Sequence, residues 1–116
     1  MKDEIKKRLS DIHTAILDIE SFLGEKRDFI EYTKNKMLKS AVERKLEIIG
    51  EATNYILKVK PDIEIAGARR IVDMRNRVIH AYDSVDDQII WGIVVNHIPK
   101  TKTQVERMLA DDSNNE

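Results

Sequence analysis

The sequence predicts an all-α protein built as an antiparallel bundle of four to five helices. Apolar residues recur at three- and four-residue intervals along most of the 116-residue chain, the spacing of helices that bury one face. Sustained apolar–polar alternation, which would indicate strands, is absent, and aromatic residues make up only 5% of the chain. The length suits one domain, which we assign to residues 1–110, followed by a disordered polar tail at 111–116.

The first two helices are separated by a glycine. The first helix begins near the N-terminus and ends at Gly24, a residue favoured at helix C-termini. A short second helix is predicted over residues 28–33, with Phe29, Ile30 and Tyr32 as its apolar contacts. The apolar stripe of the first helix consists of Ile5, Leu9, Ile12, Ile16, Ile19 and Leu23.

Three longer segments complete the bundle. The third helix runs from about residue 35 to 59 and stops before Pro61. The fourth covers about 65–82, and the fifth starts at an acidic turn with Ser84 as the predicted N-cap. Pro99 is expected to kink or break the fifth helix before a last helical segment. The third helix has the apolar stripe Leu38, Ala41, Val42, Leu46, Ile49, Ala52, Ile56 and Val59.

The composition argues against several classes of protein. The net charge of −1 argues against nucleic-acid binding through overall charge, although a local basic site remains compatible with it. Cysteine is absent, so the chain has no disulfide framework and no thiolate zinc site. No apolar run approaches the length of a membrane helix, and the charged N-terminus does not resemble a signal peptide. We therefore expect a cytoplasmic protein.

The fourth helix concentrates the side chains that could perform chemistry. On an ideal helix Arg75 lies within ~60° of five apolar positions, so its charge needs an acidic partner, an anion or a wet cleft. Asn76 and His80 are neighbours at i,i+4 on an adjacent stripe. Arg75 and His80 point ~140° apart, and a twin helix from a second subunit would bring two such sets around one groove. The five apolar positions are Ile71, Val72, Val78, Ile79 and Tyr82.

These groups suit cleavage of an RNA phosphodiester without a metal. An imidazole titrates near neutral pH, so His80 could remove the 2′-hydroxyl proton or protonate the leaving oxygen. Arg75 could hold the phosphate through two hydrogen bonds and stabilise the charge of the transition state. Asn76 could orient either the imidazole or the phosphate.

Each of these residues also has a structural explanation. His80 could be a solvated or capping residue, and Tyr82 could be a core residue with its hydroxyl at the surface. A basic run on the third helix is usually only a solvated face; it comprises Lys34, Lys36, Lys39, Arg44 and Lys45. A metal site could be drawn from four acids around His80, but their spacing matches no hard-ligand template. These four acids are Asp73, Asp83, Asp86 and Asp87.

The motif on the fourth helix resembles a known signature. Arginine, four residues, histidine, one residue and tyrosine is the pattern of the HepT-like branch of the HEPN superfamily. Here it reads Arg75, His80 and Tyr82, with the customary Asn76 after the arginine. The block at 41–52 and the acidic turn leading to Trp91 are similar as well, so that the resemblance extends over roughly residues 3–105.

The resemblance implies the toxin half of a type VII-like HEPN–MNT toxin–antitoxin pair. Such a protein is an all-helical homodimer whose motif lines the interface groove, and it cleaves RNA without a metal or cofactor. Arg75 and His80 would be the catalytic pair, supported by Asn76. Tyr82 would accept AMP from a minimal nucleotidyltransferase antitoxin, which silences the toxin.

Two other functional classes compete with this interpretation. The chain could be a non-catalytic nucleotide- or partner-binding subunit of a nucleotidyltransferase complex, with the same fold and dimer. It could also be a plain helical dimerisation domain, but this would leave Arg75 on an apolar face without an explanation.

Overall fold

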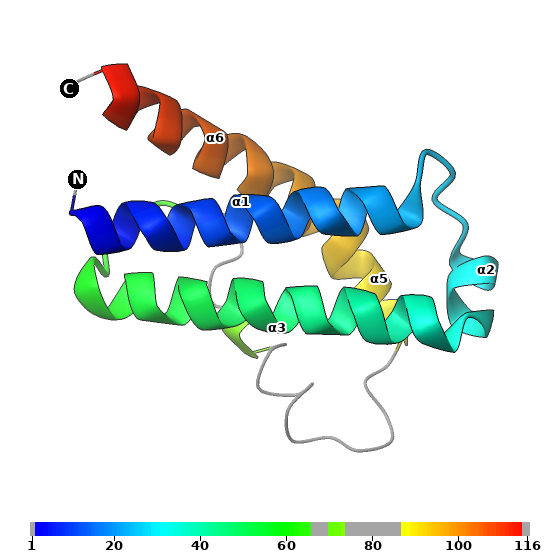
Figure 1. The fold of residues 1–116 in the computed structure, drawn as a ribbon. Helices are drawn as coiled ribbons and strands as arrows, with labels where there is room; N and C mark the ends of the chain where they lie inside the picture. Colours follow the sequence, from blue (N-terminus) through cyan, green and yellow to red (C-terminus); the bar gives the residue numbers. More distant parts are fainter. Residues whose placement is uncertain (1, 66–69, 74–86, 115–116) are drawn as a thin grey trace.

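Two long antiparallel helices, α1 (Asp3–Leu23) and α3 (Lys36–Val59), lie side by side at the centre of the molecule (Figure 1). The computed structural model describes residues 2–65, 70–73 and 87–114. The short helix α2 (Phe29–Lys34) joins them at one end. The fold is thus organised around an antiparallel helix pair, as the sequence predicts.

The C-terminal part of the chain is one helical run with a change of register. It consists of α5 (Asp87–Gly92), a π-helix η1 (Ile93–His97) and α6 (Ile98–Asn114). α6 packs along α1, and the two chain ends lie at the same end of the molecule (Figure 1). No strand occurs in the part of the chain that the structure describes, which confirms the all-α class there.

Most positions of the two predicted apolar stripes lie in the core, whereas Val59 of the α3 stripe is 42% exposed. The stripe positions of α1 from Ile5 to Ile19 are buried against those of α3, and α5, η1 and α6 close the core. Burial of a large aliphatic side chain stabilises the fold by about 1.5–3 kcal/mol. The largest fully buried side chains are Tyr32, Leu9, Ile12, Ile16, Ile19, Leu46, Ile49, Ile56, Ile71, Ile90, Ile93 and Val42.

The helix ends follow from particular residues. Gly24 has φ 69°, a conformation that favours glycine, and its N–H bonds to the Glu20 carbonyl at the end of α1. The Asp28 carboxylate caps α2 by accepting from the Glu31 N–H at 3.1 Å. Asn35 caps α3 by accepting from the Leu38 N–H at 3.0 Å.

Polar contacts at the rim join the helices. Lys45 and Asp18 link α3 to α1 at 2.9 Å, and Lys102 and Glu20 link α6 to α1 at 3.0 Å. The Arg8 guanidinium lies 4.5 Å from the centre of the Tyr55 ring. Because these groups are partly exposed, each ion pair contributes at most about 1 kcal/mol. They therefore set the register of the helices more than they stabilise the fold.

Some predictions differ from the structure. Pro99 does not break the helix: the helical run continues from η1 through Pro99, the second residue of α6. The irregularity is instead the preceding π-helix, in which the Ile98 N–H bonds to the Ile93 carbonyl. Ile30, predicted as an apolar contact, is 57% exposed. α6 also continues to Asn114, through the first residues of the stretch expected to be disordered.

Candidate functional site

The four predicted site residues lie outside the described part of the chain. Arg75, Asn76, His80 and Tyr82 all belong to the segment 74–86, as does the predicted N-cap Ser84. Their roles therefore remain predictions. The structure does describe the chain on both sides of this segment, at residues 70–73 and from Asp87 onward.

The flank before the segment is a helical turn at 70–73. Ile71 and Val72 are buried, whereas Arg70 and Asp73 are exposed. This division confirms the first two positions of the apolar face predicted for the fourth helix.

The flank after the segment is fixed by an ion pair between distant parts of the chain. Asp87 is the first residue of α5, and its Oδ2 accepts a hydrogen bond from Lys39 Nζ of α3 at 3.0 Å. Both side chains are partly buried, so this pair is less screened by solvent than the exposed pairs elsewhere. We call the Lys39–Asp87 pair the α5 anchor.

Aromatic packing holds α2 against α5 next to the anchor. The Tyr32 and Trp91 ring centres are 5.2 Å apart, and those of Phe29 and Trp91 are 5.7 Å apart. Tyr32 is 1% exposed, yet its hydroxyl has no hydrogen-bond partner among the residues that the structure describes. Burial, followed by the nearby carboxylates of Glu43 and Asp87, raises the pKa of Tyr32, so the phenol stays protonated at neutral pH.

Glu43 lies one helical turn after Lys39 on α3 and belongs to the same polar group. Burial raises the pKa of its carboxyl, and the Asp87 carboxylate adds to this rise, while the Lys39 ammonium opposes it. The pKa of Glu43 is therefore raised overall. Sequence analysis missed this group because it depends on a contact between residues 48 positions apart. The only local signal was the i,i+4 spacing of Lys39 and Glu43.

The raised pKa of Glu43 predicts a pH-dependent stability. A carboxyl whose folded pKa exceeds its unfolded value of about 4.3 favours folding when protonated. This contribution is therefore complete below about pH 4 and is lost as the pH rises through the folded pKa. Glu43→Gln should remove this part of the decline in the free energy of unfolding as the pH rises. Urea unfolding of both proteins between pH 4 and 7 measures it, and a wild-type–variant difference that is constant with pH would contradict the prediction.

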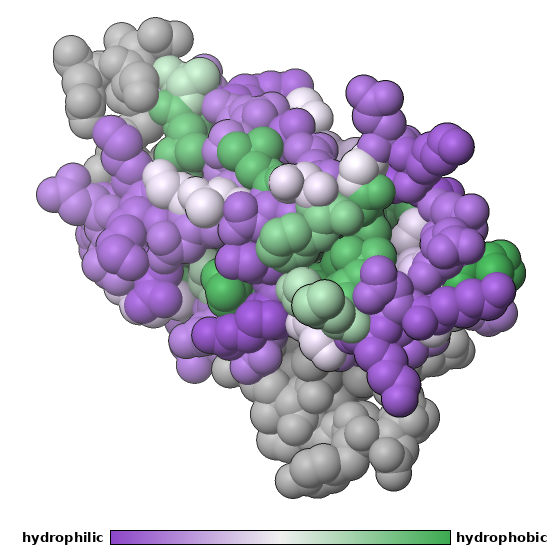
Figure 2. Space-filling model, turned by 45° about the vertical axis from the view of Figure 1, so that its right-hand side comes forward, coloured by the Kyte–Doolittle hydropathy of each residue, from purple (hydrophilic) through white to green (hydrophobic). Residues whose placement is uncertain are grey.

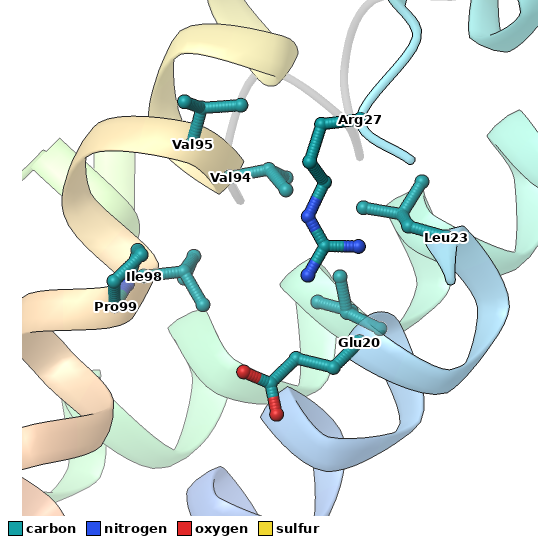
Figure 3. Close-up of a pocket in the computed structure, with 8 residues that line it drawn as sticks. Glu20, Leu23, Arg27, Val94, Val95, Ile98 and Pro99 are labelled. Carbon is teal, nitrogen blue, oxygen red and sulfur yellow. The ribbon is translucent and has the colours of Figure 1, made fainter. Parts of the chain in front are cut away.

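A cavity of about 150 Å³ opens between α1, the α1–α2 loop and the start of α6. Its wall is mostly apolar, and the side chains of Glu20 and Arg27 reach it from α1 and the loop (Figure 3). Both charged groups are already engaged, because Glu20 accepts from Lys102 at 3.0 and 3.2 Å and Arg27 donates to the Gly24 carbonyl.

The described residues hold no group of three or more His, Asp or Glu side chains suited to a metal ion. Of the four acids considered with His80 as metal ligands, Asp87 is paired with Lys39 and Asp73 is exposed. Asp83 and Asp86 lie outside the described residues. No helix in residues 2–65, 70–73 and 87–114 is long and apolar enough to cross a membrane.

Comparison with known proteins points to one family. The family model described as "Ribonuclease HepT-like" matches residues 12–108. A protein of Methanocaldococcus jannaschii named "Putative RNase MJ1380" is 37% identical over 106 residues, covering 90% of this chain and 96% of its own. "Probable ribonuclease HepT" of Thermococcus cleftensis is 38% identical over 112 residues, covering 93% and 98%. No solved structure matches the chain.

Proposed function

The chain belongs to the HepT-like ribonuclease family, and we propose that it is a metal-independent endoribonuclease, the toxin of a HEPN–MNT toxin–antitoxin pair. One observation carries this proposal: the family match over residues 12–108 includes the whole stretch from Arg75 to Tyr82. Two relatives named as ribonucleases support this activity, because the chain is similar to each of them over nearly their full length. We place its action in the cytoplasm, where cellular RNA is accessible.

The proposed reaction needs only acid–base chemistry and charge stabilisation. The 2′-oxygen attacks the adjacent phosphorus as its proton passes to a base, and the bond from phosphorus to the 5′-oxygen breaks as that oxygen gains a proton. His80 is the proposed acid or base, and Arg75 holds the non-bridging phosphate oxygens. Asn76 supports the pair by orienting the imidazole or the phosphate. The products are a 2′,3′-cyclic phosphate and a free 5′-hydroxyl.

We place the active site at the interface of a homodimer. The spacing of Arg75 and His80 directs them to different sides of one helix, so a second copy of that helix would complete the set. The groove at the interface would then combine residues from both subunits.

Tyr82 is the proposed switch. A nucleotidyltransferase partner would transfer AMP from ATP to its hydroxyl, with pyrophosphate leaving, and the new phosphate would occupy Arg75 and block RNA. Mass spectrometry of the chain co-expressed with its partner should show one adenylate on Tyr82. Tyr82→Phe, which lacks the acceptor oxygen, is the control. An unmodified Tyr82 in the co-expressed protein would remove this regulatory role.

The competing proposal, a non-catalytic subunit of a nucleotidyltransferase complex, predicts the same fold and the same partner. A cleavage assay separates the two, because only the toxin cuts RNA when it is free of its partner and unmodified at Tyr82. A neighbouring reading frame with a Gly-Ser and paired-Asp nucleotidyltransferase pattern would support the pairing in either case.

A further inference from the structure

The predicted basic run begins at Lys34, the last residue of α2, and continues along α3 to Lys45. Some of its cations form ion pairs with described residues and others do not. Lys39 pairs with Asp87, Arg44 with Glu47 at 3.5 Å, and Lys45 with Asp18. Lys34 and Lys36 differ: both are exposed, and neither has an ion pair with any residue that the structure describes. The chain also has no acidic residue between positions 31 and 43. Among the described residues, these two lysines at the junction of α2 and α3 are therefore free of ion pairs.

This junction is held firmly in place. Asn35, between the two lysines, caps α3, and the aromatic contacts of Trp91 hold α2 against α5. Lys36 lies one turn before Lys39 on the same side of α3, and Lys39 bonds to Asp87, the first described residue after the segment 74–86. Lys36 thus lies one helical turn from the residue that binds Asp87, the first described residue after the segment that carries the proposed catalytic residues.

Apolar side chains are exposed around the same lysines. Ile30, one turn before Lys34 on α2, is 57% exposed, and Met37, next to Lys36, is 81% exposed. Figure 2, in which the α2 end of the molecule is turned forward, shows hydrophobic residues gathered in patches on a largely hydrophilic face. Cations interleaved with apolar groups suit single-stranded RNA, which presents both phosphates and unstacked bases.

We propose that Lys34 and Lys36 form a second phosphate-binding site, which holds the RNA strand next to the phosphate that is cleaved. This inference rests on the proposed function for the identity of its ligand. Two independent features favour RNA over a protein partner: the excess positive charge and the position beside the catalytic segment. Because the contacts are to phosphates, they would raise affinity for RNA of any sequence.

The test compares two charge reversals at opposite ends of α3. Lys34→Glu/Lys36→Glu alters the proposed site, and Lys58→Glu/Lys60→Glu makes the same change in net charge at the other end of α3. Lys58 and Lys60 are also exposed and have no ion pair with described residues. The 24 residues of α3 separate the two pairs by about 36 Å. Circular dichroism confirms that both variants are folded.

Binding of a fluorescent single-stranded RNA is measured at several salt concentrations in the cleavage-deficient His80→Ala background. The Lys34/Lys36 variant should bind at least ten-fold more weakly, and its slope of log K against log salt should fall by about 1.4, because each lost phosphate contact contributes about 0.7. The Lys58/Lys60 variant should bind like its parent. Equal losses in both variants, or none in either, would overturn the inference.

The same proteins separate this inference from the proposed function. If His80-containing protein cuts RNA and the Lys34/Lys36 reversal leaves affinity and salt slope unchanged, the second site is wrong and the ribonuclease proposal stands. If no protein cuts RNA but the reversal still weakens binding selectively, the site stands and the ribonuclease proposal fails. Lysines that contact a protein partner instead would leave both RNA measurements unchanged, which also overturns the inference.

Discussion

Replacing His80 by alanine is expected to slow RNA cleavage by about 10²–10⁴-fold, the range for loss of a general acid or base. The imidazole is the only group in the proposed site that titrates near neutral pH, so no neighbour can take over its proton transfer. Initial cleavage rates of the wild-type and variant proteins on the same RNA measure the effect. The unfolding midpoint in urea shows whether the variant is still folded.

The proposed active site, which combines residues of two subunits, provides a further control for the His80 prediction. Arg75→Ala should also lose cleavage, whereas a dimer formed by co-expressing the Arg75→Ala and His80→Ala chains should regain activity. In that dimer one groove receives an intact Arg75 from one chain and an intact His80 from the other. A folded His80→Ala protein that cuts RNA at the wild-type rate would contradict the catalytic role of His80.

Replacing Leu46 by alanine is expected to lower the free energy of unfolding by about 2–5 kcal/mol. Leu46 is fully buried in the core and lies on α3, the helix that packs most extensively against α1. The substitution removes apolar contacts and leaves a cavity that a rigid helix pair can close only in part. Urea unfolding at fixed pH measures the loss.

Leu17 provides the matched control for the core prediction. It lies on α1 but is 43% exposed, so Leu17→Ala makes the same chemical change with much less buried surface. The loss of stability should be well under half of that for Leu46→Ala. Equal losses in the two variants would contradict the assignment of the core to the stripes of α1 and α3.

Local patterns predicted much of the fold because they depend on neighbours along the chain. The α1 stripe from Ile5 to Ile19 is buried, Gly24 ends that helix, and α3 ends at Val59, before Pro61. The break expected at Pro99 was wrong, because the helical run continues through this residue, with a π-helix directly before it. The π-helix that precedes it has no signal in the sequence.

The sequence predicted the motif residues of the candidate site but not the tertiary contacts beside them. The motif residues were found from their local spacing and from the resemblance to a family, and the buried Ile71 and Val72 agree with the predicted orientation. The α5 anchor of Lys39 and Asp87 was not predictable, because tertiary packing alone brings these residues to 3.0 Å. Tertiary packing also decides which cations of the basic run form ion pairs, so the sequence did not distinguish Lys34 and Lys36 from the paired ones.

The most direct measurement of the central claim is RNA cleavage by the wild-type chain, purified without its partner and shown by mass spectrometry to be unmodified at Tyr82. The assay contains EDTA, and the product ends are identified. We expect cleavage that leaves 2′,3′-cyclic phosphate and 5′-hydroxyl ends and that His80→Ala prevents. Intact RNA after incubation with the folded, unmodified wild-type protein would contradict the claim that this chain is a metal-independent ribonuclease.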